Sequence, residues 1–449
     1  MSTKANLVQD PIKPTLVRMT VPMMFGIVSL MLFNLVDLFF IGQLGTEPLA
    51  AVGFTFPVTF SITSLGIGLG VGTSATLGRL MGAGERNKAS CLATDNLWGT
   101  LLLVVIVTLL ARLALDTLFA GMGATPELMP YIQAYMGMWL YGGMFLVLNM
   151  VGNSCMRAAG DTKTPAKLMA LSSLINLILD PLLIFGWGPV PALGVEGAAL
   201  ASVIAWAITL GLICITLYKR QLISAQSWDI KRVWGNWYEV MRIGVPAATS
   251  NMMTPIANGF LTAIVAGFGS EAVAAFGVGN RLESLSLLVC LALSMSLPPF
   301  ISQNDGAGQN RRVSVAYRMA VQFALIWQAV IYLVLWLFAD AIATLFSDQQ
   351  EVQAWIKIWI LIVPIGFGFQ ATTFLTASSF NALHQPLRAM RISVTRLFLL
   401  YVPLGWIGSH FWGLEGMFVC LVVANALTAA TAWWWMSGFI NRNQRAPFA

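Results

Sequence analysis

Charged residues are scarce in this chain of 449 residues. Only 10% of the residues are Asp, Glu, Lys or Arg, 57% are apolar, and the mean hydropathy is +0.76. Soluble domains carry about a quarter charged residues, so the composition excludes a soluble globular protein and predicts a membrane protein. The apolar runs are continuous and do not alternate in units of about ten residues, which excludes a transmembrane β-barrel.

Cysteine and histidine are also rare. Five Cys and two His are scattered through the chain without a CxxC pair. This pattern predicts packed, inert side chains, with no disulfide framework, no metal site and no cofactor.

Long apolar runs divide the chain into predicted transmembrane helices. Windows of about 20 residues are long enough to cross the hydrocarbon layer. The twelve predicted spans are 14–43, 51–78, 91–121, 129–154, 164–186, 194–219, 236–263, 272–300, 311–340, 352–378, 389–409 and 413–440. The polar start of the chain and the length of the first run are unlike a cleaved signal peptide, so we expect the first helix to act as the insertion signal.

The excess of basic residues predicts topology. The net charge is +6, and with the N-terminus taken as cytoplasmic all Lys and Arg except Arg112, Arg281 and Lys357 fall on the inner side. This asymmetry follows the positive-inside rule and predicts that both termini are cytoplasmic. The basic charge therefore gives no reason to expect a nucleic-acid partner.

The two halves of the sequence resemble each other. Arg18 and Pro22 recur 224 residues later as Arg242 and Pro246, and LGTEPLAAVG (44–53) recurs at the same offset as FGSEAVAAFG (268–277). Farther on, LGVEGAALASVIA (193–205) matches WGLEGMFVCLVVA (412–424). Internal repeats of this kind are typical of transporters.

The repeat predicts the fold class. We expect an all-α polytopic membrane protein with twelve transmembrane helices in two six-helix lobes, related by a pseudo-twofold axis along the membrane normal. The predicted domains are an N-terminal lobe (1–222) with the coupling pocket, a cytoplasmic linker (223–235) and a C-terminal lobe (236–449).

Three acidic residues lie inside predicted spans, where a charged side chain costs about 2.5–3.5 kcal/mol or more. Asp37 and Asp180 each lie 16 residues beyond the cytoplasmic starts of their helices at Val21 and Thr164, a rise of about 24 Å. The two acids are therefore expected at similar depth in one lobe. The third acid, Glu283, lies in the other lobe.

Polar neighbours support a shared site around the two aspartates. Asn34 and Asn176 each precede an aspartate by about one helical turn, on the same helix face. The fourth span adds Tyr135 and Asn153. The N-terminal lobe has no intramembrane base, so the carboxylates can take up a proton or a cation, but not comfortably both. This exclusivity predicts an antiporter; the alternative is that the acids are protonated packing residues bonded to the asparagines.

Two further features remain open to two interpretations. Pro22 and Gly26 in the first span can form a hinge below Asp37, or a fixed kink. Arg281 and Glu283 in the eighth span are two residues apart and do not face each other; they hold the C-terminal lobe together or contact substrate or ion.

Several motifs together carry a family resemblance. These are NLVDLFFIGQLGTEPLAAVGF, GAG (82–84), RAAGDTKTP (157–165), NLILDPLLIFG (176–186) and GVEGAALAS (194–202), with weaker echoes in the second half. The chain resembles the MATE (multidrug and toxic compound extrusion) transporters, and its RLE and QNDGAG (303–308) are similar to the bacterial DinF-like branch.

The resemblance implies a secondary active multidrug exporter of the bacterial inner membrane. It implies alternating-access export of cationic amphipathic compounds in exchange for protons, by a monomer whose only other partner is the lipid bilayer. It also implies that Asp37, Asp180, Asn176, Tyr135 and Asn153 form the coupling pocket. NorM-like members carry further acids in the seventh and tenth helices, which this chain lacks, so protons are favoured over sodium.

Three alternatives belong to other classes of function. A sodium-coupled exporter remains possible at the same pocket. A flippase for lipid-linked oligosaccharides shares the architecture, but its pyrophosphate cargo calls for a cationic cavity. An intramembrane aspartic protease needs a GxGD motif, and the nearest string is AAGD (158–161) in a polar loop, so an enzyme is not expected.

Overall fold

The regular structure of the chain is helical. The computed structural model describes residues 6–189, 191–224 and 229–445. The helices are α1 (Ile12–Gly42), α2 (Thr46–Gly82), α3 (Arg86–Gly121), α4 (Met129–Ala158), α5 (Lys163–Phe185), α6 (Val195–Lys219), α7 (Ile230–Ala266), α8 (Ser270–Ser286), α9 (Leu288–Gly306), α10 (Asn310–Leu337), α11 (Ala339–Phe346), α12 (Gln350–Ile362), η1 (Val363–Gly366), α13 (Phe367–Ala382), α14 (Pro386–Val394), η2 (Thr395–Tyr401) and α15 (Val402–Arg445).

The helices follow the predicted spans, although a count by length and hydropathy gives fewer. In the described part of the chain, nine helices are long and apolar enough to cross a membrane, and the pair α8–α9, bent by 44°, is a possible tenth. One of the nine, Pro386–Arg442, covers the last two predicted spans. It is broken by Gly413, whose φ of 69° is not helical. The twelfth predicted span lies in α7, whose central turns are rich in Ser, Thr and Asn.

The internal repeat extends to the backbone. Gly45 and Gly269, which are 224 residues apart, both have positive φ (124° and 107°) just before a helix begins. Gly194 and Gly413, from the matched GVEG and GLEG motifs, have φ of 58° and 69°. Such conformations favour glycine because a Cβ would be strained there. The repeated glycines therefore specify equivalent turns.

The helices pack into two compact units. One consists mainly of Val21–Ala248, and the other of Leu7–Thr20 together with the chain from Thr249 onward. Packing thus groups the first turns of α1 with the second unit, and the first half of α7 with the first unit. The predicted lobes (1–222 and 236–449) follow the sequence repeat, and that division stays a prediction.

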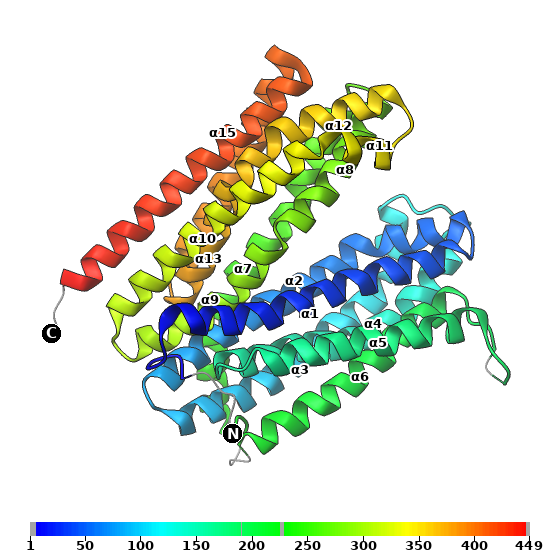
Figure 1. Ribbon diagram of the computed structural model, residues 1–449. Coiled ribbons are helices and arrows are strands. Elements are labelled where there is room, and N and C mark those ends of the chain that lie inside the picture. Colours follow the sequence, from blue (N-terminus) through cyan, green and yellow to red (C-terminus); the bar gives the residue numbers. More distant parts are fainter. Residues whose placement is uncertain (1–5, 190, 225–228, 446–449) are drawn as a thin grey trace. The chain divides into compact units, whose positions relative to one another are not determined.

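In the first unit, α4 is the central helix. It packs against α2, α3 and α6, and α5 lies beside α6 (Figure 1). Small residues allow the close approach of α2 to α4: a Cβ on Gly66 or Gly70 would lie 2.7 Å from the Met150 sulfur or 2.6 Å from the Ser154 hydroxyl. Close packing through small residues is a principal source of helix association in membranes.

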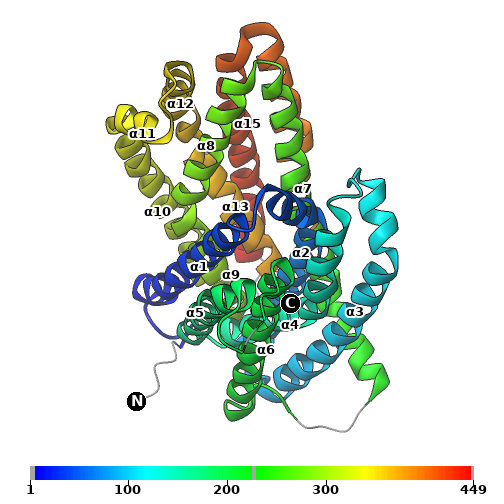
Figure 2. The same cartoon turned by 90° about the vertical axis from the view of Figure 1, so that its right-hand side faces the viewer.

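In the second unit, α13 has the equivalent central place. It packs against α9, α10 and α15, and α8 lies alongside α12 (Figure 2). Tyr317 on α10 shares a hydrogen bond of 2.7 Å with Thr376 on α13 and stacks on Trp433 of α15. The buried core of this unit is thus partly polar and aromatic.

The leading ends of α1 and α7 are anchored by matching contacts. In the second unit, the Thr20 and Ser296 hydroxyls share a hydrogen bond of 2.7 Å. The residues 224 positions away from this pair are Gly244 and Gly72, and they also meet, in the first unit: a Cβ on Gly72 would lie 3.1 Å from the Gly244 nitrogen. The repeat therefore includes the way each leading segment is held.

Candidate functional site

The structure brings three predicted site residues of the first unit together. Asp180 on α5 is fully buried, Tyr135 on α4 is 7% exposed, and Asp37 on α1 is half-buried. The two aspartates lie close enough to interact electrostatically, and Tyr135 interacts with both carboxylates. The equal depth of Asp37 and Asp180 along their helices is what allows this meeting.

Neither aspartate has a basic partner in the described part of the chain. Both carboxylate oxygens of Asp180 and Oδ1 of Asp37 are buried without a hydrogen-bond partner among the described residues. A buried carboxylate without compensation is strongly unfavourable. The pair therefore suits a site that takes up a proton or a cation.

The asparagine beside Asp180 is held by a residue that sequence reasoning missed. Asn176 is fully buried, and its side-chain amide donates a 3.2 Å hydrogen bond to the hydroxyl of Ser202 on α6. Its amide oxygen has no partner among the described residues. Asn176 thus lies one turn from Asp180 with its amide engaged elsewhere, so Asp180 does not depend on it for charge balance. Ser202 follows the GVEG motif, and only that proximity in sequence points to it.

The remaining predicted polar residues of this unit are less closely tied to the carboxylates. Asn34 on α1 is exposed, and no hydrogen bond joins it to a described residue. Asn153 on α4 is half-buried, and its amide oxygen has no partner within the described ranges. Their predicted part in the pocket stays a prediction.

The predicted hinge lies in an unbroken helix. α1 runs continuously from Ile12 to Gly42 through Pro22. Gly26 packs tightly on α5, since a Cβ there would lie 3.2 Å from both the Cα of Ala166 and the sulfur of Met169. Any bend of α1 at this point must therefore also change its contact with the helix that carries Asp180.

The charged pair of the second unit is separated by its surroundings. Arg281 is exposed and makes no ion pair with a described residue. Glu283 accepts a 2.6 Å hydrogen bond from the amide of Gln370 on α13 and interacts electrostatically with Arg396 on η2. Sequence reasoning missed Arg396 because it grouped this residue with the cytoplasmic basic residues.

Another acid of the first unit is fully paired. Asp161, in the turn between α4 and α5, forms an ion pair with Arg220 and accepts a 3.1 Å hydrogen bond from the backbone amide of Thr164. Burial opposes its ionisation, but the hydrogen bonds from Thr164 and Arg220 hold its pKa below the usual value. This pair closes the turn of the RAAGDTKTP motif.

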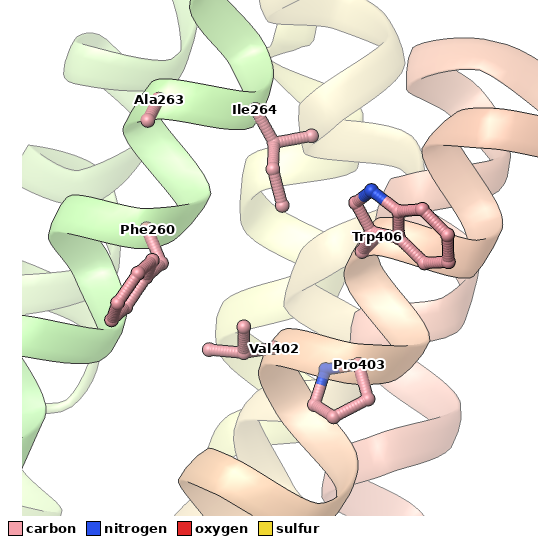
Figure 3. A pocket seen from close by; sticks show the side chains of 6 residues that line it. All are labelled: Phe260, Ala263, Ile264, Val402, Pro403 and Trp406. Carbon is pink, nitrogen blue, oxygen red and sulfur yellow. The ribbon is translucent and has the colours of Figure 1, made fainter.

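The second unit also carries an apolar groove of about 460 Å³ between α7 and the start of α15 (Figure 3). Its lining residues are Phe260, Ala263, Ile264, Val402, Pro403 and Trp406. Without a charged side chain, this groove offers no place for an ion.

Comparison with known proteins identifies the family. The MatE family model matches residues 22–182 and again 246–407. The second match begins 224 residues after the first, at the offset of the internal repeat. The chain belongs to the MATE family of secondary transporters. Members of this family are transporters and not enzymes.

Individual relatives span nearly the whole chain. A FAD transporter of Shewanella oneidensis is 41% identical over 95% of both chains. A probable multidrug resistance protein NorM of Thermotoga maritima is 24% identical over 92% of this chain and 89% of its own. The crystal structure of the Vibrio cholerae MATE transporter VcmN in the bent form is 35% identical, with a TM-score of 0.91 over 96% of this chain and 98% of its own. The MATE fold is therefore shared by this multi-pass membrane protein.

Proposed function

We propose that this transporter exports its cargo in exchange for protons, and that Asp37 and Asp180 are the coupling site. The observation that carries the proposal is that two mutually interacting carboxyl groups are buried without a basic partner in the described part of the chain. Protonation from the outer side removes the charge of the pair and resets the carrier. Asn176, Tyr135, Asn34 and Asn153 line the same pocket.

A flavin dinucleotide is the cargo that we favour. The FAD transporter of Shewanella oneidensis is 41% identical to this chain, whereas the multidrug proteins of Thermotoga maritima and Bacillus subtilis are 24% and 27% identical. Cationic amphipathic drugs are the second candidate, because an anionic pair attracts a cation. The site for the bacterial inner membrane, cytoplasmic termini, a monomeric state and the DinF-like branch remain parts of the proposal.

Transport into everted vesicles separates these possibilities. Vesicles that contain the protein are given a pH gradient or a sodium gradient, and uptake of FAD and of a fluorescent cation is followed in each. We expect uptake of FAD with the pH gradient and little with sodium alone. Uptake of the fluorescent cation without FAD would replace the flavin assignment by the drug assignment, and uptake that follows only sodium would replace the proton.

A further inference from the structure

Arg396 is a buried base in the second unit. It lies in η2, a π-helical segment, and its side chain is 4% exposed. Its guanidinium carbon lies 4.9 Å from the ring centroid of Phe374 and 5.5 Å from that of Tyr401. π-helical turns occur frequently at functional sites. The geometry therefore places a cation between two aromatic rings at an irregular turn of a helix.

Most hydrogen-bond donors of this guanidinium have no protein acceptor. Its Nε donates a 3.2 Å hydrogen bond to Oδ1 of Asn425 on α15, and the side chain makes no other hydrogen bond or ion pair with a described residue. Arginine has five N–H donors, and the four on its terminal amino groups form the fork that matches a phosphate or carboxylate. A buried charged donor without an acceptor is costly. The fork is thus suited to an anionic ligand.

Glu283 balances the charge without closing the fork. It interacts electrostatically with Arg396, yet no ion pair within 4 Å joins the two side chains. Its Oε1 instead accepts the 2.6 Å hydrogen bond from Gln370, which is itself 4% exposed. Gln370 therefore holds the only described acid near Arg396 in place, and the guanidinium remains available.

We propose that Arg396 binds a phosphate group of the exported cargo, namely the diphosphate of a flavin dinucleotide. This inference rests on the function proposed above and explains how it can work. A diphosphate is repelled by the paired aspartates of the first unit, so an anionic cargo needs its cation elsewhere. The planar guanidinium matches phosphate oxygens in a two-pronged geometry. The first unit then holds the proton, and the second unit holds the anion.

Comparison of FAD with riboflavin, which has the isoalloxazine ring but no phosphate, tests this role. Binding of each flavin to the purified protein in nanodiscs is measured by fluorescence anisotropy. We expect the parent to prefer FAD. In Arg396→Lys and Arg396→Gln, FAD affinity should fall by about ten- to hundredfold, the range for hydrogen bonds to a charged group, while riboflavin affinity stays unchanged.

Arg388 supplies the matched control. Its guanidinium carbon also lies over aromatic rings of the second unit, 4.8 Å from the centroid of Phe439 and 5.8 Å from that of Phe380. Arg388→Gln should keep the preference for FAD. Equal affinity of the parent for FAD and riboflavin, or a parental preference in the folded Arg396 variants, would overturn the proposal.

A second measurement does not depend on flavin as the cargo. Inorganic pyrophosphate should raise the melting temperature of the parent, and this shift should be absent in Arg396→Lys, which keeps the positive charge and folds more readily than the Gln variant. A shift of equal size in both proteins would overturn anion binding at Arg396. If pyrophosphate binds as expected but no flavin does, only the flavin cargo is wrong and the anion site stands.

Discussion

The buried aspartates of the first unit fall into two groups that differ in their partners. Asp95 and Asp161, which are 3% and 8% exposed, are each paired with an arginine, Arg232 and Arg220 respectively. Asp180 is fully buried and has no hydrogen-bond partner on either oxygen among the described residues. A paired acid stabilises the fold, whereas an unpaired one is retained at the expense of stability. This contrast marks Asp180 as functional.

Replacement of a paired acid should therefore destabilise the protein in a pH-dependent way. The hydrogen bonds that lower the pKa of Asp161 stabilise the fold above the unfolded pKa of about 3.9, and this contribution is lost as the pH falls through the lower folded value. We expect Asp161→Asn to reduce the stability by about 2 kcal/mol at neutral pH. Thermal unfolding in detergent at several pH values measures the difference, which should shrink in acid. A difference independent of pH would contradict this role.

Sequence reasoning found some of these residues and missed others for identifiable reasons. Counting residues from the helix starts located Asp37 and Asp180 because depth in a helix is proportional to residue number. Arg396 was misplaced because α14 continues through η2 into α15, so that this residue lies more than two turns inside a helix. The partner of Asn176, Ser202, depends on how α5 packs on α6, which no periodicity reveals.

At the scale of helices, α1 and α7 each link the two compact units. The boundary between the units falls after Thr20 in α1 and after Ala248 in α7. The repeated prolines, Pro22 and Pro246, lie within two residues of these points. The sequence predicted a hinge only at Pro22 and Gly26, and the structure adds the equivalent place in α7. Since a proline removes one backbone hydrogen bond, both helices are weakest where they pass from one unit to the other.

Protonation of Asp37 should change the geometry of α1 if this hinge operates. Labels placed on α1 and on α4, within the first unit, report their separation at acidic and alkaline pH. We expect the separation to change with pH in the parent and to stay at its acidic value in Asp37→Asn, which mimics the protonated acid. A separation that does not respond to pH in the parent would leave Pro22 as a fixed kink.

Close packing holds the first half of α7 against α2. A Cβ on Gly72 would lie 2.3 Å from the carbonyl oxygen of Val240. We expect Gly72→Ala to destabilise the protein by about 1–3 kcal/mol, the range for overpacking. Gly211→Ala in α6 is the control, since a Cβ there meets nothing within 4 Å, and alanine favours a helix by up to about 1 kcal/mol over glycine. Equal thermal stability of the two variants would show that α2 and α7 separate easily.

At the scale of the whole molecule, the sequence predicted more than composition alone suggests. The repeat and the apolar runs predicted a polytopic helical membrane protein, and the family comparison shows the MATE fold. The spans were predictable because hydrocarbon thickness sets their length. The cargo was not, since paired acids favour a cation whereas the relative that is 41% identical transports FAD. Separate sites for proton and anion reconcile these observations.

The central claim is that the two aspartates couple cargo export to protons, and transport driven by an imposed pH gradient tests it most directly. In proteoliposomes, Asp37→Asn and Asp180→Asn should each reduce this transport by about ten- to hundredfold, the loss expected for one interaction with a charged group. Asp116→Asn should keep the parental rate, because Asp116 is exposed and accepts only a hydrogen bond from Gln133. Parental rates in both of the first two variants, with the folds intact, would contradict the account.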